Sequence, residues 1–124
     1  MDTSTAYKIK TYNAIAPVGL QRFDSGDYTV GPELEGADAM LLRSHKLSVE
    51  ELTPGLRAIA RAGAGVNNVP VDACSQAGIV VFNTPGANAN SVKELVLTGL
   101  LLASRDVIGG VNYVRSLADV SDDA

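Results

Sequence analysis

Three short apolar runs, each followed by a polar or glycine-rich loop, constrain the fold of this 124-residue chain most strongly. They cover residues 39–42, 56–61 and 79–82. Such runs are typical of parallel strands that are buried on both faces of a sheet. Two further strands are predicted before them, at residues 8–12, where polar and apolar side chains alternate, and at residues 28–30.

The segments between the runs carry helix signals. Residues 17–23 are predicted to form a short helix. Ser48 and Glu51 have the spacing of a capping box, in which each side chain bonds the backbone amide of the other residue, and they predict a second helix. A third helix is predicted over residues 71–77.

Strands that alternate with helices favour parallel pairing, because parallel neighbours need a crossover connection. We therefore predict an α/β fold. It should contain an open, mostly parallel five-stranded sheet with helices on both faces, in the strand order of flavodoxin-like proteins.

A long helix is predicted after the last strand. A second capping-box pattern at residues 91–94 places its start at Val92, and it should end near Arg105. Its side chains are apolar almost all round over residues 92–103, so we expect cover on several sides. Gly109 and Gly110 are expected to break the helical path.

Composition excludes several classes of partner. The net charge is −4 and the basic residues are scattered, so we expect neither nucleic acid nor an anionic membrane as a partner. No apolar run approaches the roughly 20 residues needed to span a bilayer, and the first residues do not resemble a signal peptide. The single cysteine, Cys74, suits a reducing compartment. The expected location is the cytoplasm.

A glycine-rich loop follows the second apolar run. Its glycines resemble a dinucleotide fingerprint, but Asn68 stands where glycine or alanine is needed, and no carboxylate follows about 20 residues later. Backbone amides in such a loop can instead bind a small anion. The alternative is a tight turn that needs glycine for its geometry alone.

Side chains at the strand ends could bind the same ligand. Arg43 and Arg61 each end an apolar strand, and a guanidinium group is suited to a carboxylate or a phosphate. Asn83 and Thr84 follow the last strand, where they could bond a ligand or only shape the turn. His45 has no acidic neighbour in sequence, so we expect no catalytic role for it, and we expect no metal site.

Several segments together resemble one known family. They are Arg43-Ser44, the loop from Arg61 to Val69, residues 78–85 and residues 91–95. These segments resemble the N-terminal part of the D-isomer-specific 2-hydroxyacid dehydrogenases, and the resemblance extends over residues 8–105.

The resemblance implies two parts of the chain with different roles. Residues 1–88 would be the N-terminal part of the substrate-binding domain, and residues 89–124 a crossover helix and tail leading to an NAD-binding domain that the chain lacks. Asn88 would lie at the cleft between the domains. The expected substrate-binding residues are Arg43, Ser44, Arg61, Ala62, Gly63, Ala64, Gly65 and Val66, with backbone amides of the loop holding the substrate's carboxylate. Asn67 departs from the family pattern, since close relatives often carry aspartate there.

The implied reaction is hydride transfer between NAD and C2 of a small anionic 2-hydroxy acid. The family's catalytic histidine, carboxylate and arginine would lie beyond Ala124, so we expect the isolated chain to be inactive, to need no cofactor itself and to be part of a larger enzyme. An alternative is a stand-alone flavodoxin-like module that binds a regulatory anion. We also expect a homo-oligomer, with contacts through the apolar helix at residues 92–103.

Overall fold

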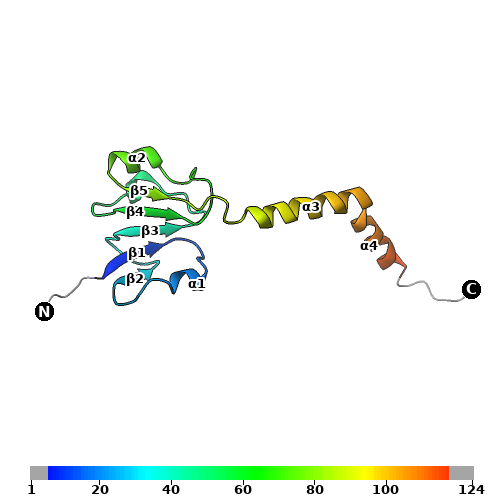
Figure 1. Cartoon of the computed structure of the whole chain (residues 1–124), viewed down its shortest axis with the longest axis horizontal. Coiled ribbons are helices and arrows are strands. Elements are labelled where there is room, and N and C mark those ends of the chain that lie inside the picture. Colours follow the sequence, from blue (N-terminus) through cyan, green and yellow to red (C-terminus); the bar gives the residue numbers. More distant parts are fainter. Residues whose placement is uncertain (1–5, 118–124) are drawn as a thin grey trace, which may run out of the picture. The chain divides into compact units, whose positions relative to one another are not determined.

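The computed structural model describes residues 6–117, which divide into two compact units between Ala87 and Asn88. The first unit contains a five-stranded sheet in which every neighbouring pair is parallel (Figure 1). The strand order is β2-β1-β3-β4-β5, the flavodoxin-like order that the sequence predicted. The strands are β1 (Tyr7–Thr11), β2 (Tyr28–Gly31), β3 (Ala39–Leu42), β4 (Ala58–Arg61) and β5 (Val80–Phe82).

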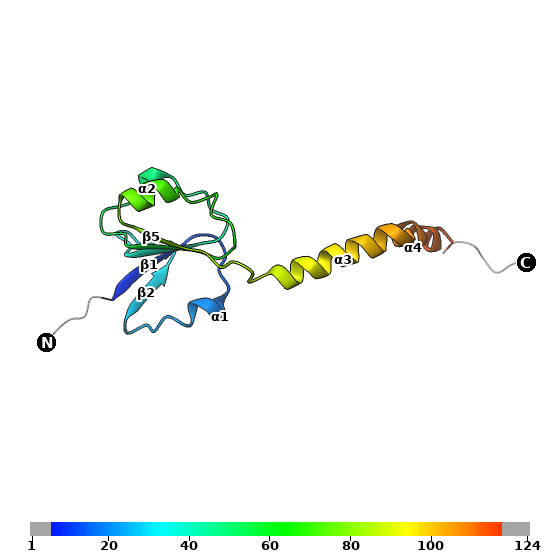
Figure 2. The same cartoon turned by 45° about the horizontal axis from the view of Figure 1, so that its top comes forward.

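Short helices lie on both sides of this sheet. Figure 2 shows α2 above the sheet and α1 below it, as the α/β prediction requires. The predicted capping-box helix is a single 3₁₀ turn, η1, in which the Glu51 carboxylate accepts from the Ser48 amide at 2.8 Å. The helices of this unit are α1 (Pro17–Leu20), η1 (Val49–Glu51) and α2 (Val71–Gln76).

The core lies on the side of the sheet that faces α2. Leu42 of β3 and Ile59 of β4 are fully buried, and so is Cys74 of α2. Burial raises the pKa of the Cys74 thiol, which suits a packing role better than a reactive one. The remaining core residues are Met40, Leu47, Leu56, Val69 and Ile79. This core fixes the positions of β3 and β4, and therefore of the loops that follow them.

The second unit consists of two helices, α3 (Ala89–Arg105) and α4 (Val107–Ser116). Two predictions about this unit are wrong. The long helix begins at Ala89, not at Val92, and its N-cap Asn88 makes no side-chain capping bond. The Glu94 carboxylate accepts instead from the side-chain amide of Asn90 at 2.7 Å, so it is not used as a capping group.

The break in the helical path is at Asp106, and the glycine pair at residues 109–110 lies inside α4. Asp106 has a left-handed backbone with φ of 43°, and its Oδ1 accepts from the Gly109 amide at 3.2 Å. A Cβ at Gly109 would collide with the Asp106 side chain. Gly109 therefore provides space for the cap of α4 and does not break the helix.

The apolar surface of α3 is exposed in the described chain. No residue of α3 is buried, and Leu95 and Leu101 are 73% and 68% exposed. We predicted that other residues would cover α3 on several sides. Within the pair of helices α3 and α4, no residues provide this cover. No helix of the described residues is long and apolar enough to cross a membrane.

Candidate functional site

The loops after β1, β3 and β4 lie side by side, because these strands are adjacent and parallel. The carboxyl edge of such a sheet is the usual place for a ligand. All the predicted substrate-binding residues lie on or beside these loops: Arg43 and Ser44 follow β3, Arg61 ends β4, and residues 62–66 follow it. The sequence therefore placed the candidate site on one edge of the sheet.

The glycine-rich loop after β4 presents a run of unused backbone amides. Among the described residues, the amides of residues 64–67 donate to no protein acceptor. Ala64, Gly65 and Asn67 are exposed, and Val66 is half-buried. Successive exposed amides can bind a carboxylate or a phosphate. This loop has the donors that an anion requires.

The Arg61 side chain folds back onto its own loop. Its Nη1 donates to the Gly65 carbonyl at 2.7 Å, and its Nε donates to the Arg43 carbonyl at 3.1 Å. A Cβ at Gly63 would collide with this guanidinium group. Arg61 therefore holds the loop in shape, and Gly63 makes room for it, while the other N–H groups of Arg61 have no protein partner within residues 6–117.

Residues after β5 support the same loop from the other side. The side-chain amide of Asn83 donates to the Ala64 carbonyl at 2.7 Å, and the Thr84 amide donates to the Gly63 carbonyl at 3.0 Å. Of the two roles left open by the sequence, these contacts correspond to shaping the turn. The glycine loop is thus held by residues at the ends of β4 and β5.

This loop does not fit a dinucleotide. A pyrophosphate needs close access to glycine backbone, and here the Arg61 guanidinium lies where a side chain on Gly63 would be. Pro70 has no amide to donate, and α2, which it precedes, is only six residues long. The glycine-rich loop is therefore not shaped to hold the pyrophosphate of NAD.

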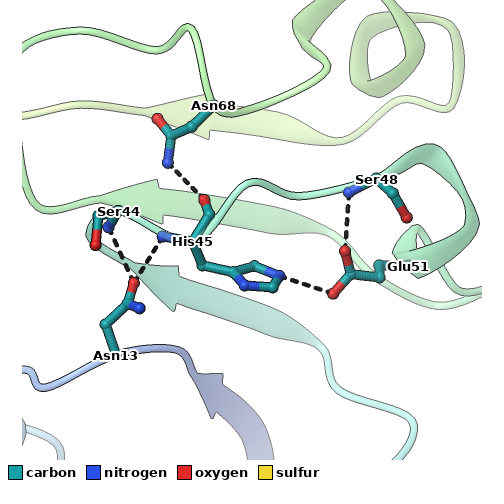
Figure 3. A network of polar contacts seen from close by, with 6 residues as sticks. All are labelled: Asn13, Ser44, His45, Ser48, Glu51 and Asn68. Carbon is teal, nitrogen blue, oxygen red and sulfur yellow. Dashed lines mark hydrogen bonds and ion pairs between the residues drawn. The ribbon is translucent and has the colours of Figure 1, made fainter.

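The backbone of the segment Arg43–His45 forms hydrogen bonds with two asparagines from neighbouring loops. Figure 3 shows the bonds to Ser44 and His45. Asn13, after β1, accepts through Oδ1 from the amides of Ser44 at 2.9 Å and His45 at 2.7 Å. Asn68, at the end of the glycine loop, donates through Nδ2 to the carbonyls of Arg43 at 3.3 Å and His45 at 2.7 Å. Neither role was predicted from the sequence, where Asn68 was interpreted only as a residue in place of glycine. An asparagine in the loop after a strand, such as Asn13 after β1, is a usable signal for such a role.

His45 has an acidic partner in space that is not its neighbour in sequence. The 3₁₀ turn of η1 brings Glu51 to the imidazole, with Nε2 and Oε1 3.0 Å apart (Figure 3). The ring also stacks on Tyr12, with centroids 4.2 Å apart. Burial, together with a hydrogen bond to Glu51, raises the pKa of Tyr12 to about 12. These contacts tie the end of β1 to η1.

A largely apolar hollow adjoins the candidate site. Its volume is about 540 Å³, and it is lined by residues 14–19, Arg43 and Ala62. This volume lies within the range of roughly 300–1,000 Å³ that is typical of small-molecule sites. Arg43 is the charged residue among those lining residues. Its side chain makes no hydrogen bond or ion pair with any residue of the described part of the chain. Arg43 is therefore available to a ligand that lies in the hollow.

Comparison with known proteins identifies the family. The family model for the catalytic domain of D-isomer-specific 2-hydroxyacid dehydrogenases matches residues 6–118. The chain belongs to this family. The match extends over nearly the whole sheet unit and the helix pair, so the resemblance seen in the loops holds across the chain.

Individual members of the 2-hydroxyacid dehydrogenase family are similar to this chain over part of their length. A D-3-phosphoglycerate dehydrogenase of Mycobacterium tuberculosis is 43% identical over 74 residues, which cover 57% of this chain and 14% of that protein. An (S)-sulfolactate dehydrogenase of Chromohalobacter salexigens is 40% identical over 73 residues, covering 56% and 24%.

A solved structure gives the same relationship. It is the 3-phosphoglycerate dehydrogenase of Entamoeba histolytica with NAD⁺ bound, with a TM-score of 0.66 and 28% identity. The similarity covers 79% of this chain and 39% of that one. The matched segment is thus well under half the length of these 2-hydroxyacid dehydrogenases.

Asn88, predicted to face a cleft between domains, is the exposed N-cap of α3. Its carbonyl accepts from the Val92 amide at 3.1 Å. Its side chain makes no hydrogen bond within the described residues and is available for contacts outside them.

Proposed function

We propose that this chain is the substrate-binding segment of an NAD-dependent D-3-phosphoglycerate dehydrogenase, an enzyme that oxidises 3-phosphoglycerate in serine biosynthesis. The observation that supports it most is the run of unused amides at residues 64–67, beside the unpaired guanidinium group of Arg43. Amides of the loop bind the substrate's carboxylate, and Arg43 binds its phosphate. Two anion sites suit a substrate that carries two anionic groups.

Another D-2-hydroxy acid is the alternative substrate. The similarity to an (S)-sulfolactate dehydrogenase supports it, because that protein is nearly as similar to this chain as the 3-phosphoglycerate enzymes are. Lactate, glyoxylate and glycerate are further candidates. The carboxylate of each of these acids would bind the same loop. The acids differ in the chemical group that would lie beside Arg43.

Hydride transfer is proposed to need residues outside the matched segment. The support is the small share of each relative that the match covers, together with a glycine loop that does not fit NAD. When bound by the complete enzyme, NAD would supply the hydride acceptor. We propose that the described residues bind the substrate. We also propose that the chain alone is inactive and binds no cofactor.

We also propose a cytoplasmic location and a homo-oligomeric state. The lone buried Cys74 suits a reducing compartment. The exposed leucines of α3 provide an apolar surface for self-association. Stand-alone anion binding without any dehydrogenase is the alternative function.

Titration calorimetry of the pure chain with 3-phosphoglycerate tests the proposal. We expect weak binding, reduced about tenfold in Arg43→Gln, since a charge-assisted hydrogen bond contributes on the order of 1.5 kcal/mol. Arg22→Gln, an exposed arginine outside the site, is the matched control and should bind as the unchanged chain does.

Equal binding by Arg43→Gln and the unchanged chain would refute the role of Arg43. D-glycerate, which lacks the phosphate, should bind both proteins equally. A preference for D-lactate or sulfolactate over 3-phosphoglycerate would favour the alternative substrates. The same preparations should form no NADH from NAD and 3-phosphoglycerate, and clear NADH formation would contradict the proposed division of labour.

A further inference from the structure

The segment Arg43–His45 has no helix or strand to satisfy its backbone. It lies between the end of β3 and the 3₁₀ turn η1. Two carbonyls and two amides of this segment are bonded, and every one of these bonds involves a side chain from a neighbouring loop or, for the Arg61 bond to the Arg43 carbonyl, from the end of β4. The position of Arg43 and Ser44 is therefore set by those side chains and not by regular secondary structure.

Asn13 is suited to the amide half of this arrangement. Its φ is 66°, a left-handed conformation that asparagine and aspartate adopt more readily than other residues with a side chain. In this conformation its Oδ1 accepts from the amides of both Ser44 and His45. An amide oxygen has two lone pairs, so one asparagine can satisfy both donors.

Asn68 is suited to the carbonyl half. Its Nδ2 donates to the carbonyls of Arg43 and His45, and its own carbonyl accepts from the Leu47 amide at 2.9 Å. Its Oδ1 is buried and has no partner among the described residues. The reversed orientation would place that oxygen against two carbonyl oxygens, so the two bonds through Nδ2 decide how the side chain lies.

Asn68 also ends the glycine loop, whose amides at residues 64–67 are unused. One side chain therefore joins the two anion-binding elements of the candidate site. Asn13 fixes the same segment from the β1 side (Figure 3). Together they hold Arg43 at a set spacing from the glycine loop.

We propose that Asn13 and Asn68 are positioning residues that set this spacing and so select a ligand with two anionic groups. The inference rests on the proposed function, because it assigns one anionic group to the loop and the other to Arg43. A ligand that contacts only the loop does not depend on the spacing. Loss of either asparagine should therefore weaken 3-phosphoglycerate binding more than D-glycerate binding.

Two variants of Asn13 distinguish a role in positioning the segment Arg43–His45 from a role in folding of the chain. Asn13→Gly keeps the left-handed backbone and removes the acceptor, whereas Asn13→Asp keeps both. In Asn13→Gly, amide hydrogen exchange of Ser44 and His45 should accelerate about tenfold, the equivalent of about 1.4 kcal/mol. Nuclear magnetic resonance titration should show 3-phosphoglycerate binding reduced by a similar factor and D-glycerate binding unchanged. Asn13→Asp should restore both properties.

Asn68→Asp is the second variant, and it keeps the size of the side chain. It places a carboxylate oxygen against the carbonyls of Arg43 and His45, so it should release the segment even if Asn13→Gly proves unstable. Asn112→Ala, on the exposed surface of α4, is the control for loss of an asparagine side chain.

Hydrogen exchange and anion binding test two different parts of the proposal. Unchanged exchange of Ser44 and His45 in Asn13→Gly would overturn the positioning role, whatever the ligand does. Equal weakening of 3-phosphoglycerate and D-glycerate would overturn the selection by spacing. If the unchanged chain binds neither anion, the proposed function fails, and hydrogen exchange still decides whether the asparagines hold the segment.

Discussion

The Glu51 carboxylate accepts a hydrogen bond from the Ser48 amide at 2.8 Å and lies 3.0 Å from Nε2 of His45. Burial alone would raise its pKa, but bonds from the Ser48 amide, His45 and Tyr12 outweigh burial and hold the pKa of Glu51 below its ordinary value of 4.5. A lowered pKa in the folded state means that the carboxylate stabilises the fold above pH 4.5. This contribution is lost as the pH falls through the lowered pKa.

We therefore predict that Glu51→Gln lowers the free energy of unfolding at neutral pH by about 1 kcal/mol, the size of a partly exposed charge-assisted bond. The difference from the unchanged chain should shrink at pH values well below 4.5, where Glu51 itself is protonated. Urea unfolding at several pH values measures this. Glu33→Gln, at an exposed position, should show no such convergence, and a constant difference for Glu51→Gln would contradict the account.

At the scale of elements, the strands were predictable because a short, continuous apolar run is typical of a strand that is buried on both faces of a parallel sheet. The starts of the helices were harder to predict. The pattern at residues 91–94 matches a capping box, but Asn90 bonds Glu94 inside the helix and the backbone is already helical at Ala89. Local spacing cannot show which of two nearby acceptors a side chain uses.

The candidate site was also predictable only in part. The glycine loop and Arg43 follow strands whose ends meet, so their proximity is a consequence of topology. The contacts of Asn13 and Asn68 connect residues that are far apart in sequence. Such contacts depend on side-chain geometry after the sheet has formed, and no sequence periodicity encodes them.

The apolar surface of α3 leads to a prediction about association. Leu95, Leu100 and Leu101 are exposed by 63–73%, and exposed apolar surfaces of this kind are commonly buried between subunits. We expect sedimentation equilibrium to show self-association that weakens at least several-fold in Leu101→Glu. Val18→Glu, an exposed apolar position in α1, is the control. A monomer at high concentration would remove this proposal.

At the scale of the whole molecule, the described residues contain a candidate anion-binding loop that does not fit a dinucleotide. The loop that most resembles a nucleotide fingerprint has unused amides, yet Gly63 is covered by Arg61. We therefore expect this loop to bind a small anion and not a pyrophosphate.

Amide chemical shifts of the pure chain, recorded during separate titrations with 3-phosphoglycerate and with NAD, test it most directly. We expect saturable shifts at residues 64–67 with 3-phosphoglycerate and none there with NAD. Shifts at these amides with NAD but not with 3-phosphoglycerate would contradict it.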